Sequence, residues 1–247
     1  MKRFLVALQF LTILPVKIKS EIKEKDFGDS LLYFPVVGLL IGLLLSLGVL
    51  SFSFLPALVK SAMILILSIL ITGGIHLDGF ADTCDGFYGN KSGEKILEIM
   101  RDSRIGVMGV IGIVSLLLLK FSVIVSLSEA PLWKILIMMP VFSRWSQALA
   151  CNAASYARRE GKAKYFMEYA SRRDVIIGGI FTLIISVLLM QHRGLVLFFA
   201  SLIPVSLFLY YIKRRIKGMT GDTIGAVNEI AEVCVLLFGF ILIGIPV

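Results

Sequence analysis

The sequence of 247 residues is poor in charged side chains. Asp, Glu, Lys and Arg make up 17% of it, whereas a soluble domain normally carries about 25%. Hydrophobic residues account for 57% and gather in long runs, as they do in integral membrane proteins. This composition excludes an ordinary soluble enzyme. It predicts an all-α, polytopic helical bundle embedded in a lipid bilayer.

Cysteine is scarce as well. Cys84, Cys151 and Cys234 stand far apart and form no CxxC pair, which argues against a disulfide framework and a zinc site. We expect three small apolar side chains in or near helices. The sequence also lacks a repeat with a period of about 20 to 50 residues, so it indicates neither a solenoid nor an inverted-repeat transporter. A single membrane-embedded domain over residues 1–247 is predicted.

Basic residues exceed acidic ones, with a formal net charge of +8. They form short clusters in alternate connections between the apolar runs, so the excess indicates membrane topology and no nucleic-acid partner. The positive-inside rule then predicts a cytoplasmic N-terminus and an acidic loop, residues 73–105, that faces the cytoplasm.

Seven apolar runs predict about seven transmembrane helices. They are residues 31–54, 57–72, 106–127, 132–150, 175–190, 195–212 and 230–247. The segment before them, residues 1–30, begins like a signal peptide but has no small-residue cleavage site. We therefore expect a retained interfacial segment there.

The candidate chemistry concentrates at the end of the second run. Asp78, Asp82 and Asp85 lie within eight residues of one another. If the run 57–72 continues as a helix, a rotation of about 100° per residue puts all three on one narrow face. Such like charges repel one another unless a cation holds them, and carboxylate oxygens suit Mg²⁺, which also binds substrate phosphates. The three aspartates are therefore the predicted Mg²⁺ ligands and catalytic residues.

Arginines on the same predicted side are candidates for binding a diphosphate. Arg101 and Arg104 follow the aspartates, and Arg158 lies after the fourth run. Guanidinium groups match phosphate oxygens bidentately. The alternatives are a structural ion network of Arg101 and Arg104 with the aspartates, and a topology-setting cluster around Arg158. Arg144, inside the fourth run, is expected to pair with an acid, bind a substrate phosphate or snorkel.

A second acidic group follows the sixth run. Asp222 and Glu229 are seven residues apart and share a helix face, while Gly221 and Gly225 leave room for a ligand or a helix. This pattern predicts a substrate site assembled between two spans. The alternative is that Asp222 caps the last helix and Glu229 pairs with a Lys or Arg. His76 points away from the aspartates on a helix and is left out of the metal site.

Acids, a cation and a rim of arginines are typical of a site for a diphosphate substrate. Phosphoryl transfer needs neutralised phosphate oxygens and an in-line nucleophile, and a spare aspartate can accept the proton of an attacking hydroxyl.

In these blocks the chain resembles the adenosylcobinamide-GDP ribazoletransferase, or cobalamin synthase, family. The resemblance covers nearly the whole length in order, and its aspartate and Arg-Asp-Ser-Arg blocks are specific. The matching pieces are Phe10-Leu11-Thr12-Ile13-Leu14-Pro15, Pro35-x-x-Gly38-x-x-x-Gly42, Gly74-x-His76-Leu77-Asp78-Gly79-x-Ala81-Asp82-x-x-Asp85-Gly86, Met100-Arg101-Asp102-Ser103-Arg104-Ile105-Gly106, Tyr156-Ala157-Arg158 with Gly161, and Thr220-Gly221-Asp222 with Gly225-Ala226 and Glu229.

This resemblance implies the last step of nucleotide loop assembly in cobalamin biosynthesis. A ribose hydroxyl of α-ribazole, or of its 5′-phosphate form, would attack adenosylcobinamide-GDP at the phosphate next to cobinamide. The products would be adenosylcobalamin, or its phosphate, and GMP, with Mg²⁺ required at the inner face of the cell's inner (cytoplasmic) membrane. Asp78, Asp82 and Asp85 would hold the metal, and Arg101 and Arg104 would bind the diphosphate.

Other classes of membrane protein fit less well. CDP-alcohol phosphotransferases place an arginine after the first Asp-Gly, where this chain has Ala81-Asp82. Aspartate-rich prenyltransferases need a second Asn-Asp-x-x-Asp block, which the sequence does not contain. A cation-coupled transporter favours charges near the bilayer midplane, whereas these acids lie at the predicted cytoplasmic ends. The sequence leaves open whether the chain forms a homo-oligomer.

Overall fold

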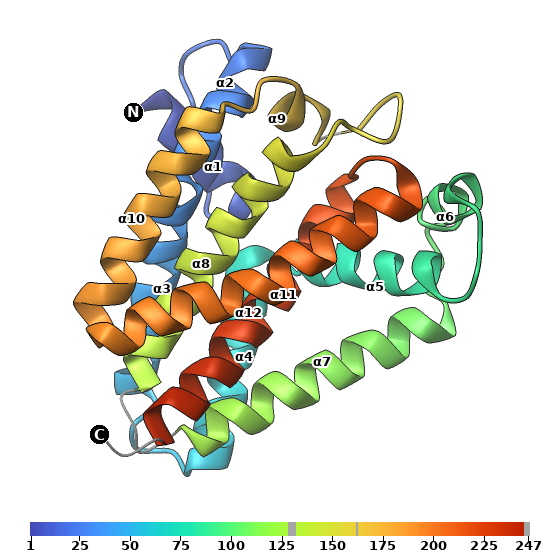
Figure 1. Cartoon of the computed structure of the whole chain (residues 1–247). Coiled ribbons are helices and arrows are strands. Elements are labelled where there is room, and N and C mark those ends of the chain that lie inside the picture. Colours follow the sequence, from blue (N-terminus) through green and yellow to red (C-terminus); the bar gives the residue numbers. More distant parts are fainter. Residues whose placement is uncertain (128–131, 162, 245–247) are drawn as a thin grey trace.

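The computed structural model describes residues 1–127, 132–161 and 163–244, and this part of the chain is all-α (Figure 1). A short 3₁₀ turn, Leu31–Tyr33, joins α2 to α3. The helices are α1 (Lys2–Leu11), α2 (Glu24–Ser30), α3 (Phe34–Ser51), α4 (Ala57–Thr72), α5 (Ile75–Phe87), α6 (Gly93–Ile99), α7 (Val107–Ser126), α8 (Leu132–Ala153), α9 (Lys164–Glu168), α10 (Arg172–Met190), α11 (His192–Ile216) and α12 (Gly221–Gly244).

Five helical segments in the described residues are long and apolar enough to cross a membrane. They are the continuous stretch Glu24–Ser51, α7, α10, α11 and α12, and the bent pair α4 and α5 makes a sixth if it counts as one span. The membrane-protein class is confirmed, with five or six candidate spans where the sequence predicted seven. The predicted span 132–150, now α8, is not among them, and the predicted span 57–72 is present only as part of the bent pair. The last predicted run reaches residues 245–247, which lie outside the described part.

The helix α8 lies at the centre of the molecule. It packs against α3 on one side and α12 on another, and α10 runs beside it (Figure 1). Nearly all of its side chains are buried, including the polar Arg144 and Gln147. These polar residues lower its hydropathy, and protein rather than lipid surrounds them. A helix in this position need not be apolar on every face.

Two glycines four residues apart let α3 approach α8 closely. A Cβ atom at Gly42 would lie 2.6 Å from the Cα atom of Ile137, and one at Gly38 would overlap the backbone of Pro140. Both contacts are with backbone, which cannot move aside as a flexible side chain can. The close contact between α3 and α8 therefore requires glycine at both positions.

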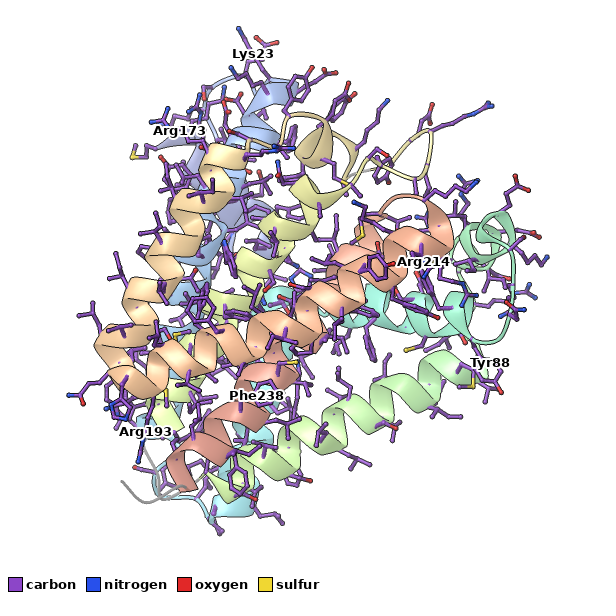
Figure 2. All side chains as sticks on the ribbon, in the orientation of Figure 1. Lys23, Tyr88, Arg173, Arg193, Arg214 and Phe238 are labelled. Carbon is purple, nitrogen blue, oxygen red and sulfur yellow. The ribbon has the colours of Figure 1, made fainter. Side chains whose placement is uncertain are left out.

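Charged side chains mark the two ends of this bundle. Lys23 and Arg173 lie at one end and Arg193 at the other (Figure 2). Because α10 runs from Arg172 to Met190 and α11 begins at His192, these two helices form a hairpin whose turn lies at the Arg193 end.

The helix of the second apolar run does not continue straight into the aspartates, which was the condition used to place them on one face. Gly73 and Gly74 have φ angles of +63° and +69°, in the left-handed region that glycine adopts without a steric penalty. The chain therefore ends α4 there and starts α5 at an angle of 91° to it. The aspartates lie on α5, where their spacing still puts them on one face.

Candidate active site

A cavity of about 260 Å³ lies among α5, α8, α9, the start of α12 and the loop between α8 and α9. It brings together three residues that the sequence singled out from separate regions, Asp78, Arg158 and Asp222. The rest of its lining is Phe10, Phe34, Ile75, His76, Gln147, Cys151, Tyr156, Gly161, Ala163, Phe166, Gly221, Ile224 and Gly225.

Close packing of α5 on α12 places Asp222 beside the first acidic group. A Cβ atom at Gly79 would lie 2.7 Å from the carbonyl oxygen of Asp222 and 2.8 Å from its Cα atom. Thr220, rather than Asp222, caps α12, because its hydroxyl accepts a hydrogen bond of 3.2 Å from the Thr223 N–H. The Asp222 side chain is thus left for the cavity.

The acids of the site outnumber its cations. Asp82 is half-buried, and the negative charges of Asp222, Asp78 and Asp85 all act on it. The opposing charge is Arg158, whose guanidinium lies 2.8 Å from Asp222 Oδ2. One guanidinium cannot balance this many carboxylates, and such an excess of negative charge favours binding of a cation.

The donor atoms suit Mg²⁺. Among the described residues, no three His, Cys, Asp or Glu side chains lie close enough together to form a metal centre alone. Mg²⁺ usually takes only one or two carboxylates from the protein and completes its shell with water and substrate phosphates. The exposed Asp78 and the half-buried Asp82, one turn apart on α5, match that requirement.

Asp85 has another partner. Its two carboxylate oxygens accept hydrogen bonds from the backbone N–H groups of Gly106 and Gly109, at 2.7 and 2.8 Å. These groups belong to the N-terminal end of α7, which otherwise leaves such donors unpaired, and an anion there is further favoured by the helix dipole. In this arrangement Asp85 fastens α5 to α7.

This contact predicts a stability effect of Asp85. We expect Asp85→Ala to lower the free energy of unfolding by about 1 to 2 kcal/mol, as loss of a helix N-cap does. Thermal unfolding of the detergent-purified protein measures the effect, with Asp102→Ala as the control, because the exposed Asp102 pairs only with Arg104. An unchanged midpoint for Asp85→Ala would contradict the capping role.

Arg101 and Arg104 lie outside the cavity lining, in the exposed segment that joins α6 to α7. Arg104 forms an ion pair of 2.8 Å with Asp102, and its hydrogen bonds lower the pKa of that carboxyl group to about 2. The segment is linked to the cavity through Arg158, whose Nη2 donates a hydrogen bond of 3.1 Å to the Met100 carbonyl.

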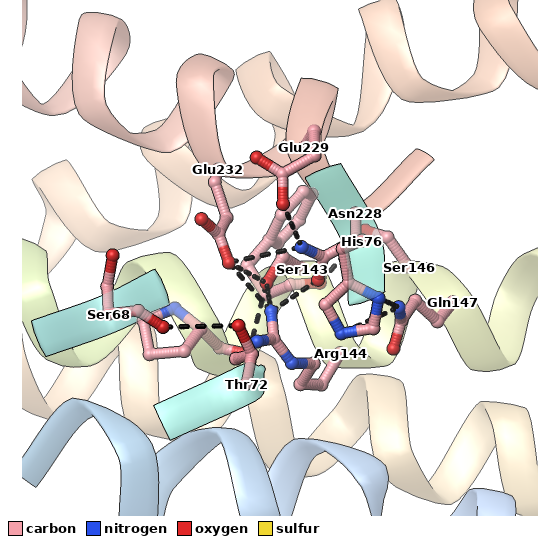
Figure 3. Close-up of polar contacts among 12 residues, drawn as sticks. Ser68, Thr72, His76, Ser143, Arg144, Ser146, Gln147, Asn228, Glu229 and Glu232 are labelled. Atoms are coloured by element: carbon pink, nitrogen blue, oxygen red, sulfur yellow. Dashed lines mark hydrogen bonds and ion pairs between the residues drawn. The ribbon is translucent and has the colours of Figure 1, made fainter. Parts of the chain in front are cut away.

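Arg144 and Glu229 belong to a separate buried ion cluster (Figure 3). Arg144 Nη1 lies 2.7 Å from Glu232 Oε1 and also donates a hydrogen bond to Asn228. Lys120 Nζ lies 2.6 Å from both Glu229 Oε2 and Glu232 Oε2. Of the alternatives that the sequence left open, pairing with an opposite charge is the one found for both Arg144 and Glu229.

Sequence analysis missed Lys120 and Glu232. Lys120 is the only charged residue of α7, and an ionisable group inside an apolar span is a signal of a buried partner. Glu232 comes one helical turn after Asn228, on the face that meets α8. Its partner could not be predicted from spacing, because the pairing joins α7, α8 and α12.

Comparison with known proteins identifies relatives along the whole chain. The family model described as cobalamin-5-phosphate synthase matches residues 3–240. An adenosylcobinamide-GDP ribazoletransferase of Alkaliphilus metalliredigens is 38% identical over 247 residues, which cover 99% of this chain and 97% of the relative. The protein of the same name from Clostridium acetobutylicum is 34% identical, over 96% of this chain and 94% of the relative. No solved structure matches the chain.

Proposed function

Because the chain belongs to the cobalamin-5-phosphate synthase family, we propose that the cavity among α5, α8 and α12 is the active site of an adenosylcobinamide-GDP ribazoletransferase. The observation that carries this assignment is the concentration of negative charge in it. Asp78, Asp222 and Arg158 line the cavity, and Asp82 lies one helical turn from Asp78 on α5, as a site for a metal-bound diphosphate requires.

The reaction replaces GMP, which is bound to the cobinamide phosphate through an anhydride bond, by α-ribazole, which becomes bound through an ester bond. A secondary ribose hydroxyl oxygen of α-ribazole, which is free in its 5′-phosphate form as well, bonds to the phosphorus next to cobinamide. The anhydride bond to GMP breaks, and GMP leaves with the bonding electrons. The hydroxyl proton passes to a base, and Asp82 is the candidate, because it is half-buried on α5 one turn from Asp78, which lines the cavity.

Each charged residue of the site has a proposed role. Asp78 and Asp82 would hold Mg²⁺, whereas Asp85, the third ligand that the sequence predicted, is engaged by the N-terminal end of α7. When bound, the ion neutralises the developing charge on the phosphate oxygens. Arg158 binds a phosphate oxygen and is itself oriented by Asp222. Arg101 and Arg104, on the exposed segment that Arg158 contacts through Met100, bind the outer part of the diphosphate.

Arg144 and Glu229 do not take part in this proposal as substrate ligands. Both are almost fully buried, and both already pair with opposite charges. The ion pair of Arg144 joins helices α8 and α12, and these same helices carry residues of the cavity wall.

We further propose that the site opens to the cytoplasm from the inner (cytoplasmic) membrane. The multi-pass helices support a membrane location. The basic clusters lie in the connections on the side of the cavity, including Arg158 and the segment from Arg101 to Arg104, and such clusters favour the cytoplasmic side. Nucleotide substrates are available there.

A product assay tests the reaction and its metal. The detergent-purified protein is incubated with adenosylcobinamide-GDP and α-ribazole, and GMP and cobalamin are quantified together. We expect equal amounts of both, complete loss of turnover after chelation with EDTA, and recovery when Mg²⁺ is added in excess. If a monodisperse, inserted protein forms neither product, the proposal is wrong, and CDP-alcohols and prenyl diphosphates are the next substrates to test.

A further inference from the structure

The cavity has two chemically different walls. Its charged residues come from α5, the loop after α8 and α12, whereas three phenylalanines come from α1, α3 and α9. The ring centroids of Phe10 and Phe166 are 4.4 Å apart, and those of Phe34 and Phe166 are 5.8 Å apart. The three rings form one continuous aromatic surface, which we call the phenylalanine wall. None of its three rings has a role in the phosphate chemistry proposed above.

A buried acceptor without a donor lines the same cavity. The Gln147 side chain is 1% exposed, and its Nε2 lies 3.1 Å from His76 Nδ1, so the amide nitrogen has a partner. Its Oε1 has no hydrogen-bond donor among the described residues. Leaving a buried acceptor unpaired is unfavourable. A ligand that brings a hydroxyl donor to this point removes that penalty.

We propose that the phenylalanine wall and Gln147 bind the nucleoside acceptor, α-ribazole. This inference rests on the proposed function, because it assigns one substrate of that reaction to one part of the site. The flat benzimidazole base lies against Phe10, Phe34 and Phe166, and a ribose hydroxyl donates to Gln147 Oε1. The reacting ribose hydroxyl then points to the charged wall, where Asp78 and Asp222 lie.

Size and polarity favour this substrate over the other one. A cavity of about 260 Å³ is at the small end of ligand pockets, which span roughly 300 to 1,000 Å³, so a nucleoside fits and the corrinoid ring must stay outside. The edge of a dimethylbenzimidazole carries methyl groups, which suit phenylalanine. The guanine of GDP carries donors and acceptors along its edge, and these would lose their water partners against such a wall.

Steady-state kinetics with each substrate varied separately tests the assignment. The variants are Gln147→Met, which keeps the shape and removes the acceptor, and Phe166→Leu, which removes a ring from the wall. We expect each to raise the KM for α-ribazole about tenfold, the effect of losing a single contact of about 1.4 kcal/mol. The KM for adenosylcobinamide-GDP stays within twofold of the wild-type value. Matched controls are Gln9→Met, on the exposed side of α1, and Phe199→Leu, exposed on α11.

Calorimetry of α-ribazole binding, in the absence of adenosylcobinamide-GDP, separates this inference from the proposed function. Ala163→Leu, which narrows the cavity from the same wall, serves as a third variant if either of the others is unstable. Weaker α-ribazole binding in the variants, without weaker GMP binding, supports the subsite even if turnover fails. A raised KM for adenosylcobinamide-GDP, or competition between GMP and α-ribazole for the wall, overturns it. The inference is overturned too if the wild-type enzyme turns over and all three variants show the same α-ribazole kinetics as the wild type.

Discussion

Asp82→Asn is expected to reduce turnover by about 100- to 1,000-fold, the usual effect of removing one electrostatic group from a reacting centre. Asparagine has almost the same shape, so the packing of α5 is kept. The substitution removes one of the two carboxylates proposed to hold Mg²⁺ and the group proposed to accept the hydroxyl proton. Asp82 is half-buried near Asp78, Asp85 and Asp222, so the substitution removes a charge from within the acidic group. Initial rates of GMP and cobalamin formation at saturating substrates measure the loss.

Two further measurements make this result specific. Glu94→Gln, an exposed acid in the first turn of α6, removes the same charge outside the cavity and is expected to keep the wild-type rate. Titration with Mg²⁺ should show that Asp82→Asn needs a higher concentration for half-maximal activity. Near-normal turnover of an inserted, monodisperse Asp82→Asn protein would falsify the assignment of Asp82 to the metal and base roles.

Much of this site follows from short-range patterns in the sequence. The spacing of Asp78, Asp82 and Asp85 depends only on helical geometry, so their common face survives although the helix before them breaks. The prediction of a site between two spans is consistent with the structure, because Asp78 and Asp222 line one cavity. Gly38 and Gly42 form a small-residue pair of another short-range kind, and α3 meets α8 there.

The parts that the sequence could not give depend on tertiary packing. A Gly73-Gly74 pair is compatible with a flexible helix or with a sharp break, and only the surrounding contacts select the left-handed conformation that bends the chain by 91°. The partner of Asp85 lies more than 20 residues away at the start of α7. An aspartate that caps a helix and one that binds a metal look the same in a list of spacings.

Lys120→Met is expected to have the largest effect on stability. Lys120 is 4% exposed and contacts two carboxylates at 2.6 Å. Removing it leaves Glu229 and Glu232 facing each other with Arg144 as the remaining cation of the cluster. Breaking a buried ion pair from one side lowers the free energy of unfolding by about 3 to 5 kcal/mol. For a chain of this length we expect the melting temperature in detergent to fall by about 10 °C.

The double variant Lys120→Met/Glu229→Gln tests whether charge balance is the cause. The cluster of Lys120, Arg144, Glu229 and Glu232 holds two positive and two negative groups, so removing one of each keeps it neutral. We expect the double variant to melt several degrees above Lys120→Met, although it carries one more substitution in the core. Replacing a buried pair by uncharged groups of similar volume is often close to neutral. If the two substitutions add instead, Lys120 acts through its packing, and the cluster is not a charge-balanced unit.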